Sequence, residues 1–359
     1  MSEKETRLPT AEAPDTAPAV GEAAETPAAQ HLLEVRHLRK YFPVEKDFFG
    51  RPVRFLRAVD DVSFTLDSGK TIGVVGESGC GKTTLGRTIL QLTPTTEGEV
   101  IFNGKNLEKL SKKDMIPLRR DLQIIFQDPF SSLSPRMPVG EIIGEAVKVH
   151  HIVPDGEVKD YVLEVMRKCG LADHYYNRYP HEFSGGQRQR ICIARALALK
   201  PKLVICDEPV SALDVSIQAQ IINLLKDLQT ETGVSYVFIS HDLSVVEYIS
   251  DDVLVMYLGN MMEKAPTADI FGNPMHPYTK ALFSAVPIPD PKRKHEKITL
   301  QGDIPSPSNP PSGCKFHTRC AYCMEVCKTE VPAFHEAEPG HFVACHLFDD
   351  KQVKPAEKH

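Results

Sequence analysis

The chain has 359 residues, of which 42% are hydrophobic, enough to bury the core of one large domain with a smaller appendage. Its formal net charge of −6 disfavours nucleic acid as a partner, because proteins that bind nucleic acids are more often basic. No run approaches the roughly 18 consecutive apolar residues that cross a bilayer, and the N-terminus has no secretion-signal pattern. We therefore expect a soluble chain whose role at a membrane comes through partners.

The composition changes twice along the chain. Residues 1–30 are rich in Ala, Glu, Pro and Thr and contain almost no large apolar side chain, which predicts a disordered tail. Residues 31–268 alternate short apolar runs with helical stretches, which predicts an α/β domain with a largely parallel sheet. Proline becomes frequent near residue 270, so a small irregular module is expected at 269–359. The predicted strands are 33–35, 62–66, 71–75, 99–102, 203–206, 235–239 and 253–257, and the predicted helices are 187–199 and 216–230.

A glycine-rich segment follows the predicted strand 71–75 and precedes a helical stretch. It reads G-x-x-x-x-G-K-T and consists of Gly76, Glu77, Ser78, Gly79, Cys80, Gly81, Lys82 and Thr83, followed by Thr84. Between a strand and a helix, this pattern predicts a loop whose backbone N–H groups wrap a polyphosphate. Lys82 is expected to reach the β- and γ-phosphates of ATP, and the Thr83 hydroxyl to bind Mg²⁺. We also expect an alkylating reagent on Cys80 to fill the phosphate space, so that ATP would protect this thiol.

Two acidic residues end the predicted strand 203–206. Asp207 lies where a carboxylate can hold Mg²⁺ through water, and Glu208 is one residue further along. We expect Glu208 to orient or deprotonate the water that attacks ATP. By itself an Asp-Glu pair indicates only a polar loop, but together with the glycine-rich segment it predicts a nucleotide-hydrolysing site.

A second glycine-rich helix start narrows the class of protein. Its residues are Ser184, Gly185, Gly186 and Gln187, and the segment resembles the signature motif of ABC ATPases, with Phe183 where leucine is usual. A helix N-terminus of this kind grips phosphate. The resemblance implies a P-loop fold with a RecA-like core, an antiparallel β subdomain and a helical subdomain. It also implies a head-to-tail dimer in which each signature loop closes the partner's site.

Further motifs follow in the order of that family. The resemblance assigns Gln127 as the glutamine that contacts Mg²⁺ and couples to the membrane subunit, and His241 as the histidine that contacts the γ-phosphate. It places Asp214, in the segment 211–214, at the dimer interface. Tyr41 resembles the aromatic residue that stacks on adenine, although the adjacent Phe42 is an equally aromatic neighbour.

The C-terminal module carries a finer resemblance. The insertion at 43–51 and the segments 276–282, 305–307 and 310–320 resemble the second ATPase subunit of oligopeptide/dipeptide importers. The resemblance implies a heterodimer with another ABC ATPase, two integral-membrane permeases, an extracytoplasmic peptide-binding protein and a place on the cytoplasmic face of the membrane. Nickel or another small solute is an alternative cargo. A soluble ABC ATPase outside transport is disfavoured, because the chain has one cassette and no long heptad run. A metal-binding scaffold protein is also disfavoured, because it would leave the ATPase motifs without a function.

Five of the nine cysteines crowd into the C-terminal module. The other four are scattered, which fits a reducing cytosol and makes disulfides unlikely. The close spacing of the five cysteines in the C-terminal module favours a metal site. The ligand chemistry permits an iron–sulfur cluster, zinc assisted by histidines, or no metal. For a [4Fe–4S] cluster, the family resemblance implies the ligands Cys314, Cys320, Cys327 and Cys345, and leaves Cys323 as an extra thiol.

Overall fold

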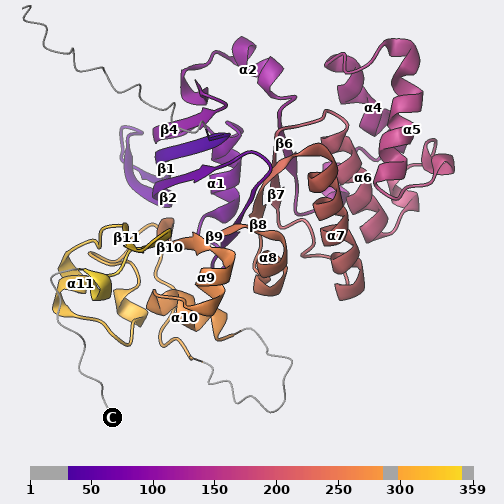
Figure 1. Cartoon of the computed structure of the whole chain (residues 1–359). Coiled ribbons are helices and arrows are strands. Elements are labelled where there is room, and N and C mark those ends of the chain that lie inside the picture. Colours follow the sequence, from indigo (N-terminus) through magenta and orange to yellow (C-terminus); the bar gives the residue numbers. More distant parts are fainter. Residues whose placement is uncertain (1–30, 286–297, 350–359) are drawn as a thin grey trace, which may run out of the picture. The chain divides into compact units, whose positions relative to one another are not determined.

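A computed structural model describes residues 31–285 and 298–349 (Figure 1). In these residues the larger sheet has eight strands in the order β11-β12-β10-β9-β3-β8-β7-β6. Five neighbouring strands run parallel: β9 (Asp252–Tyr257), β3 (Thr71–Val75), β8 (Ser235–Ile239), β7 (Leu203–Asp207) and β6 (Leu122–Ile125). The predicted α/β fold with a largely parallel sheet is confirmed.

The central strands are buried on both faces, which explains their continuous apolar sequences. In β7, Leu203 and Ile205 belong to one hydrophobic core, whereas Val204 and Cys206 belong to the other. Because successive side chains of a strand point to opposite faces, one short run supplies both cores. One core packs beneath the phosphate loop and the small antiparallel sheet, and the other packs against the helices.

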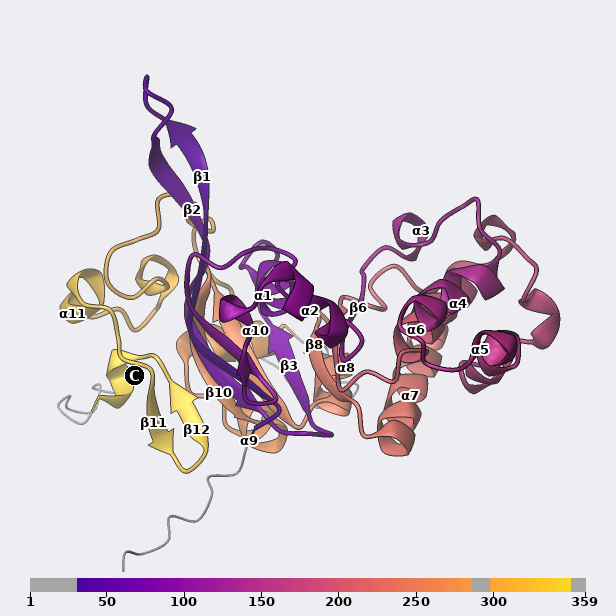
Figure 2. The same ribbon diagram turned by 90° about the horizontal axis from the view of Figure 1, so that it is seen from above.

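The small sheet has the strand order β2-β1-β4-β5 among the described residues. Its long hairpin consists of β1 (Leu33–Lys46) and β2 (Pro52–Leu66), and β4 (Glu97–Phe102) and β5 (Lys105–Asn106) complete it. The predicted strand 33–35 is therefore only the buried start of a longer strand. The predicted insertion at 43–51 contains the tip of this hairpin, which projects in Figure 2.

Helices form a separate subdomain beside β6 (Figure 1). It contains α3 (Pro129–Ser132), α4 (Val139–Val149), α5 (Val158–Lys168) and α6 (Gly185–Leu197). The remaining helices of the described chain are α1 (Lys82–Ile89), α2 (Lys112–Leu118), α7 (Val215–Thr232), α8 (Leu243–Ile249), α9 (Thr267–Gly272), α10 (Pro277–Phe283) and α11 (Glu325–Thr329). No helix in 31–285 or 298–349 is long and apolar enough to cross a membrane.

The C-terminal residues extend the large sheet instead of folding apart from it. Strand β12 (His341–Val343) pairs antiparallel with β10 (Asn260–Pro266), and β11 (His335–Glu338) pairs with β12. Beneath this junction the buried Glu263 carboxylate accepts hydrogen bonds from the backbone N–H groups of Met275 and His276, at 2.7 and 2.9 Å. Its Oε1 also lies 2.7 Å from His341 Nε2. The expected tail at 1–30 lies outside the described residues.

Candidate active site

The glycine-rich loop connects β3 to α1 and leaves no room for side chains at two of its glycines. A Cβ on Gly76 would lie 2.2 Å from the carbonyl oxygen of Met256, and one on Gly81 would lie 1.9 Å from that of Ala58. Both residues also have positive φ angles, of 149° and 108°. Glycine is therefore required at both positions, since other residues rarely adopt this conformation.

Lys82 is folded back under this loop. Its Nζ donates to the carbonyl oxygens of Gly76 and Glu77, at 2.7 and 3.1 Å, and the residue is only 5% exposed. The ammonium group thus already lies beneath the segment expected to wrap the phosphates. Two hydrogen bonds to backbone carbonyl oxygens fix the position of this ammonium group.

Thr83 and Asp207 form the oxygen-rich part of the site. The Thr83 hydroxyl donates to Asp207 Oδ1 at 2.7 Å. Burial raises the pKa of the Asp207 carboxyl, although this hydrogen bond opposes the shift. A hydroxyl and a carboxylate are the hard oxygen ligands that Mg²⁺ prefers, so the side chains fit the ion that the sequence predicted.

Three residues from the ends of three parallel strands meet opposite the loop. Gln127 follows β6, Glu208 follows β7 and His241 follows β8. Gln127 Nε2 donates to Glu208 Oε2 at 2.8 Å, and His241 Nδ1 lies 3.4 Å from the same oxygen. Glu208 has a positive φ of 48°, an uncommon conformation for a residue with a side chain. In this conformation its carboxylate lies next to Gln127 and His241.

The loop and these residues enclose one cavity of about 540 Å³. This volume is within the range of small-molecule sites. The cavity is lined by Leu56, Ala58, Ser78, Gly79, Gly81, Lys82, Thr83, Thr84, Gln127, Glu208, His241 and Pro307. Nine of the predicted site residues, from Ser78 to His241 in sequence, are therefore brought together around this cavity.

The second glycine-rich segment does not line this cavity. Ser184 caps α6 through a capping box with Gln187, in which Ser184 Oγ accepts from the Gln187 N–H and Gln187 Oε1 accepts from the Ser184 N–H. Gly186 packs against Ile217 of α7, since a Cβ there would lie 2.5 Å from its side chain. Asp214 is exposed just before α7. None of the residues 184–187 or Asp214 lines the cavity.

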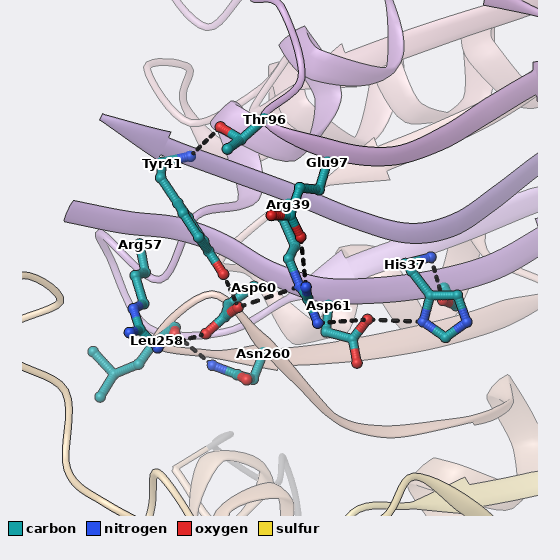
Figure 3. A network of polar contacts seen from close by, with 11 residues as sticks. His37, Arg39, Tyr41, Arg57, Asp60, Asp61, Thr96, Glu97, Leu258 and Asn260 are labelled. Carbon is teal, nitrogen blue, oxygen red and sulfur yellow. Dashed lines mark hydrogen bonds and ion pairs between the residues drawn. The ribbon is translucent and has the colours of Figure 1, made fainter. Parts of the chain in front are cut away.

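Tyr41 lies in a neighbouring recess and belongs to a polar network on the small sheet (Figure 3). Its hydroxyl donates to Asp60, its N–H donates to Thr96 Oγ1 at 2.9 Å, and the Arg57 guanidinium lies 5.7 Å from its ring centroid. Burial raises the pKa of Tyr41 to about 12. The hydroxyl is thus fixed inward, and Tyr41 lines the recess together with residues 308–312 of the C-terminal module.

The Cys80 thiol lies away from the phosphate space. Cys80 is 3% exposed, belongs to the core under the small sheet, and its Sγ is 3.9 Å from Lys82 Nζ. Burial raises the pKa of the thiol, which disfavours the reactive thiolate. The expectation that a reagent on Cys80 fills the phosphate space stays a prediction, which the burial of the thiol disfavours.

The cysteines of the C-terminal module are neighbours. Burial raises the pKa of Cys345 to about 12, and the nearby thiols of Cys314, Cys320 and Cys327 add to the shift. The N–H of Cys314 donates to the carbonyl oxygen of Cys327 at 2.9 Å. In residues 31–285 and 298–349, no three or more His, Cys, Asp or Glu side chains form a group that could hold a metal ion. All nine cysteines are free thiols.

Sequence patterns missed three residues of the C-terminal module that reach the phosphate loop or its cavity. Pro307 lines the cavity, and its carbonyl oxygen accepts from the Arg57 N–H at 3.2 Å. Tyr278 and Arg319 contact Glu77. Each lies in one of the segments 276–282, 305–307 and 310–320 that carry the family resemblance, but nothing in those segments indicated a contact with the nucleotide site.

The phosphate loop, the paired acids and the residues at the strand ends define an ATPase of the ABC transporter class. A family model described as ABC transporter matches residues 59–211, and one described as the C-terminal region of oligopeptide/dipeptide transporters matches residues 262–327. The chain is 52% identical to the oligopeptide transport ATP-binding protein AppF of Bacillus subtilis over 88% of this chain and 97% of that protein. It is 56% identical to OppF of Haemophilus influenzae, over 88% and 96% of the two chains. The chain therefore belongs to the oligopeptide transport ATP-binding proteins of the ABC transporter family.

The comparison with solved structures agrees with this family. The ATP-binding cassette MJ0796, solved as a dimer in a post-hydrolysis state bound to ADP and Pi, superposes with a TM-score of 0.59 at 26% identity. The match covers 66% of this chain and 98% of the cassette. The predicted ABC fold and ATPase class are confirmed, and membership implies ATP with Mg²⁺ as its counter-ion.

Proposed function

We propose that this chain hydrolyses ATP to drive the import of oligopeptides or dipeptides through membrane permeases. The observation that carries the proposal is the combination of a complete ATPase cavity with a C-terminal region of the oligopeptide/dipeptide transporter type. The relatives whose names describe oligopeptide transport match over nearly their whole length, which supports peptides as the cargo.

Within the cavity, the loop residues Gly76, Glu77, Ser78, Gly79, Cys80, Gly81 and Thr84 frame the phosphates. Backbone N–H groups of the loop are the donors, except that of Glu77, which donates to the Tyr278 hydroxyl. Lys82 binds the β- and γ-phosphates, for which it exchanges its contacts with the loop carbonyls. Thr83, Asp207 and Gln127 hold Mg²⁺, which neutralises charge on the phosphate oxygens. Tyr41 supplies the surface for adenine in the adjoining recess. This recess is lined by Ser308, the residue after Pro307 of the cavity.

Glu208 orients the attacking water and accepts its proton. Gln127 and His241 both hold Oε2 of this carboxylate, so that little reorganisation is needed when the water attacks. His241 also reaches the γ-phosphate, where its ring N–H stabilises developing negative charge. These roles divide the chemistry among the ends of three adjacent strands.

A second ABC ATPase subunit completes the site. Ser184, Gly185, Gly186 and Gln187 lie outside the chain's own cavity, at a helix N-terminus that suits an anion. We infer that they close the partner's nucleotide site, with Asp214 at the interface, and that the partner's equivalents close this one. Val215, 81% exposed beside Asp214, is then covered by the partner. The pair works on the cytoplasmic face of the membrane with two permeases and an extracytoplasmic peptide-binding protein.

For the cysteine module, we propose a [4Fe–4S] cluster held by Cys314, Cys320, Cys327 and Cys345, with zinc as the alternative. The support is that these four thiols neighbour one another, three of them buried, in a segment rich in proline. When bound, the metal group would cross-link the segment, as small modules with little core require. The side chains would have to move to bind it, since in the described residues these thiols do not form a group that could hold a metal ion.

Reconstitution tests the transport function. The chain is placed in vesicles with its partner ATPase and permeases, and with the peptide-binding protein added on the opposite side. Peptide should stimulate ATP hydrolysis and accumulate on the side of the membrane that holds the ATPases. Glu208→Gln should abolish both effects. If nickel and not peptide stimulates ATP hydrolysis, the cargo is nickel. ATP hydrolysis that is independent of permeases and cargo would contradict a role in transport.

A further inference from the structure

The C-terminal module holds the phosphate loop through an ion pair. The Arg319 guanidinium donates from Nη1 to Glu77 Oε2 at 2.8 Å and from Nη2 to Glu77 Oε1 at 3.1 Å. The Arg319 side chain is 7% exposed and that of Glu77 is 22% exposed. Two parallel hydrogen bonds between a guanidinium and a carboxylate fix both position and orientation. Glu77 is the second residue of the loop, whereas Arg319 directly precedes Cys320.

The backbone of the same loop residue is held from the same side. The Glu77 N–H donates to the Tyr278 hydroxyl at 2.9 Å. Tyr278 is fully buried in α10, with its ring 4.8 Å from that of Tyr257 and 5.3 Å from that of Phe316. Arg319 Nη1 also lies 3.4 Å from the Tyr257 hydroxyl. An aromatic cluster therefore supports both contacts to Glu77, and Phe316 belongs to the same short segment as Arg319.

A carboxylate in this place requires compensation. The loop surrounds a polyphosphate with several negative charges, and an unpaired carboxylate beside it repels the ligand at short range. Arg319 cancels the charge of Glu77 and ties the loop to the module at the same time. Lys82 cannot serve in its place, because its ammonium group contacts the backbone carbonyl of Glu77 and is needed for the phosphates.

We propose that Arg319 is a positioning residue for nucleotide binding, which acts through Glu77 to hold the phosphate loop open and electrically neutral. The proposal rests on the assignment of the phosphate loop made above and adds the C-terminal module to the nucleotide site. Arg319 touches no reacting atom. It is expected to set the affinity for nucleotide and to leave the rate of the chemical step, which belongs to Glu208, unchanged.

Four variants of the full chain test this role: Arg319→Gln, Arg319→Lys, Glu77→Gln and the double variant Glu77→Gln/Arg319→Gln. The control is Arg167→Gln, which breaks a bidentate pair with Asp173 of the same chemistry in the helical subdomain. Binding of Mg-ADP is measured by titration calorimetry and thermal unfolding by scanning calorimetry. The KM for ATP and kcat are measured in the assembled complex.

Arg319→Gln should raise the Kd for Mg-ADP and the KM for ATP about tenfold with little change in kcat, because it leaves an uncompensated carboxylate in the loop. Glu77→Gln added to it should recover most of this loss, whereas Arg319→Lys should lose about threefold, since lysine keeps the charge without the paired contacts. Arg167→Gln should bind as the parent does.

A Kd for Arg319→Gln within twofold of the parent overturns the proposal, even if its unfolding temperature falls. Equal losses in the single and double variants would also overturn it, because a purely structural contact is not restored by removing the charge on Glu77. If Arg319→Gln does not fold, Arg319→Lys decides: unchanged affinity refutes the role. Failure of the parent chain to bind nucleotide would instead refute the assignment of the phosphate loop.

Discussion

Gln127 and Glu208 are joined by a hydrogen bond of 2.8 Å although they are 81 residues apart in sequence. The donor follows β6 and the acceptor follows β7, and these strands are direct neighbours in the sheet. If Gln127 couples to a membrane subunit as proposed, its movement would be transmitted directly to the carboxylate proposed to orient water. Displacement of Gln127 by a permease would release or reorient Glu208 without any change in the phosphate loop.

Replacement of Glu208 by glutamine should separate binding from turnover. The amide keeps the size of the side chain but cannot accept the proton of water, so phosphate release should fall at least about 100-fold. The Kd for Mg-ATP, measured by titration calorimetry, should stay close to that of the parent. Glu231→Gln, which changes an exposed partner of Lys168, is the matched control and should leave both quantities unchanged. Parental turnover in Glu208→Gln would exclude this residue as the base.

The cysteine in the phosphate loop should resist alkylation in the folded protein. Cys80 is buried and the pKa of its thiol is raised, so both access and thiolate are lacking. Mass spectrometry after brief maleimide treatment should find label on Cys323 and none on Cys80, with or without Mg-ATP. Labelling of Cys80 that Mg-ATP prevents would show instead that the loop opens to expose it.

Metal analysis of anaerobically purified protein decides the nature of the cysteine module. A [4Fe–4S] cluster predicts about four iron atoms and four sulfides per chain, and a brown colour. Cys345→Ser should lose the iron and lower the unfolding temperature, while Cys323→Ser should keep both. Stoichiometric zinc without iron would replace the cluster, and full iron content in Cys345→Ser would refute that ligand.

Acid should weaken the junction between the sheet and the C-terminal module. Burial lowers the pKa of His276 to about 4, whereas in the unfolded chain it is near the ordinary value of 6.5. The unfolded state therefore binds the proton first, and the stability present above pH 6.5 is lost as the pH falls toward 4. The loss amounts to at most about 3 kcal/mol.

The His276→Asn variant checks this pH dependence. His276 caps α10 by accepting from the Tyr278 N–H, and asparagine can cap in the same way without titrating in this range. Unfolding free energies from urea titrations at pH 7 and pH 5 should differ less in the variant than in the parent. An equal difference in both would assign the acid sensitivity to another group.

The sequence predicted the parts of the fold that local pattern controls. The strand at 203–206 was predicted almost to its bounds because both of its faces are buried, so every residue is apolar. The outer half of β1 was missed, since it is exposed and is held by pairing with β2 and not by burial. Helices α4 and α5 were not predicted, although their apolar stripes pack on α6.

The phosphate site was predictable for a related reason. Its residues follow strand ends in short motifs, and the parallel sheet brings those ends to one edge. The contact between Arg319 and Glu77 was not predictable, because 242 residues separate them and the two motifs that contain them give no sign of the pairing. The burial of the Cys80 thiol was not predictable, because the motif specifies the path of the backbone but not the side to which this thiol turns.

The pairing of Glu263 with His341 has a consequence for the order in which the chain can mature during synthesis. These two residues are 78 positions apart, and the carboxylate is fully buried at the place where β12 pairs with β10. Until residues 341–343 have left the ribosome, Glu263 lacks its imidazole partner and β10 offers a free edge to other strands. A nascent chain that stalls near residue 330 would therefore carry all the residues of the ATPase cavity together with an unpaired strand edge at β10, a site for aggregation or chaperone binding.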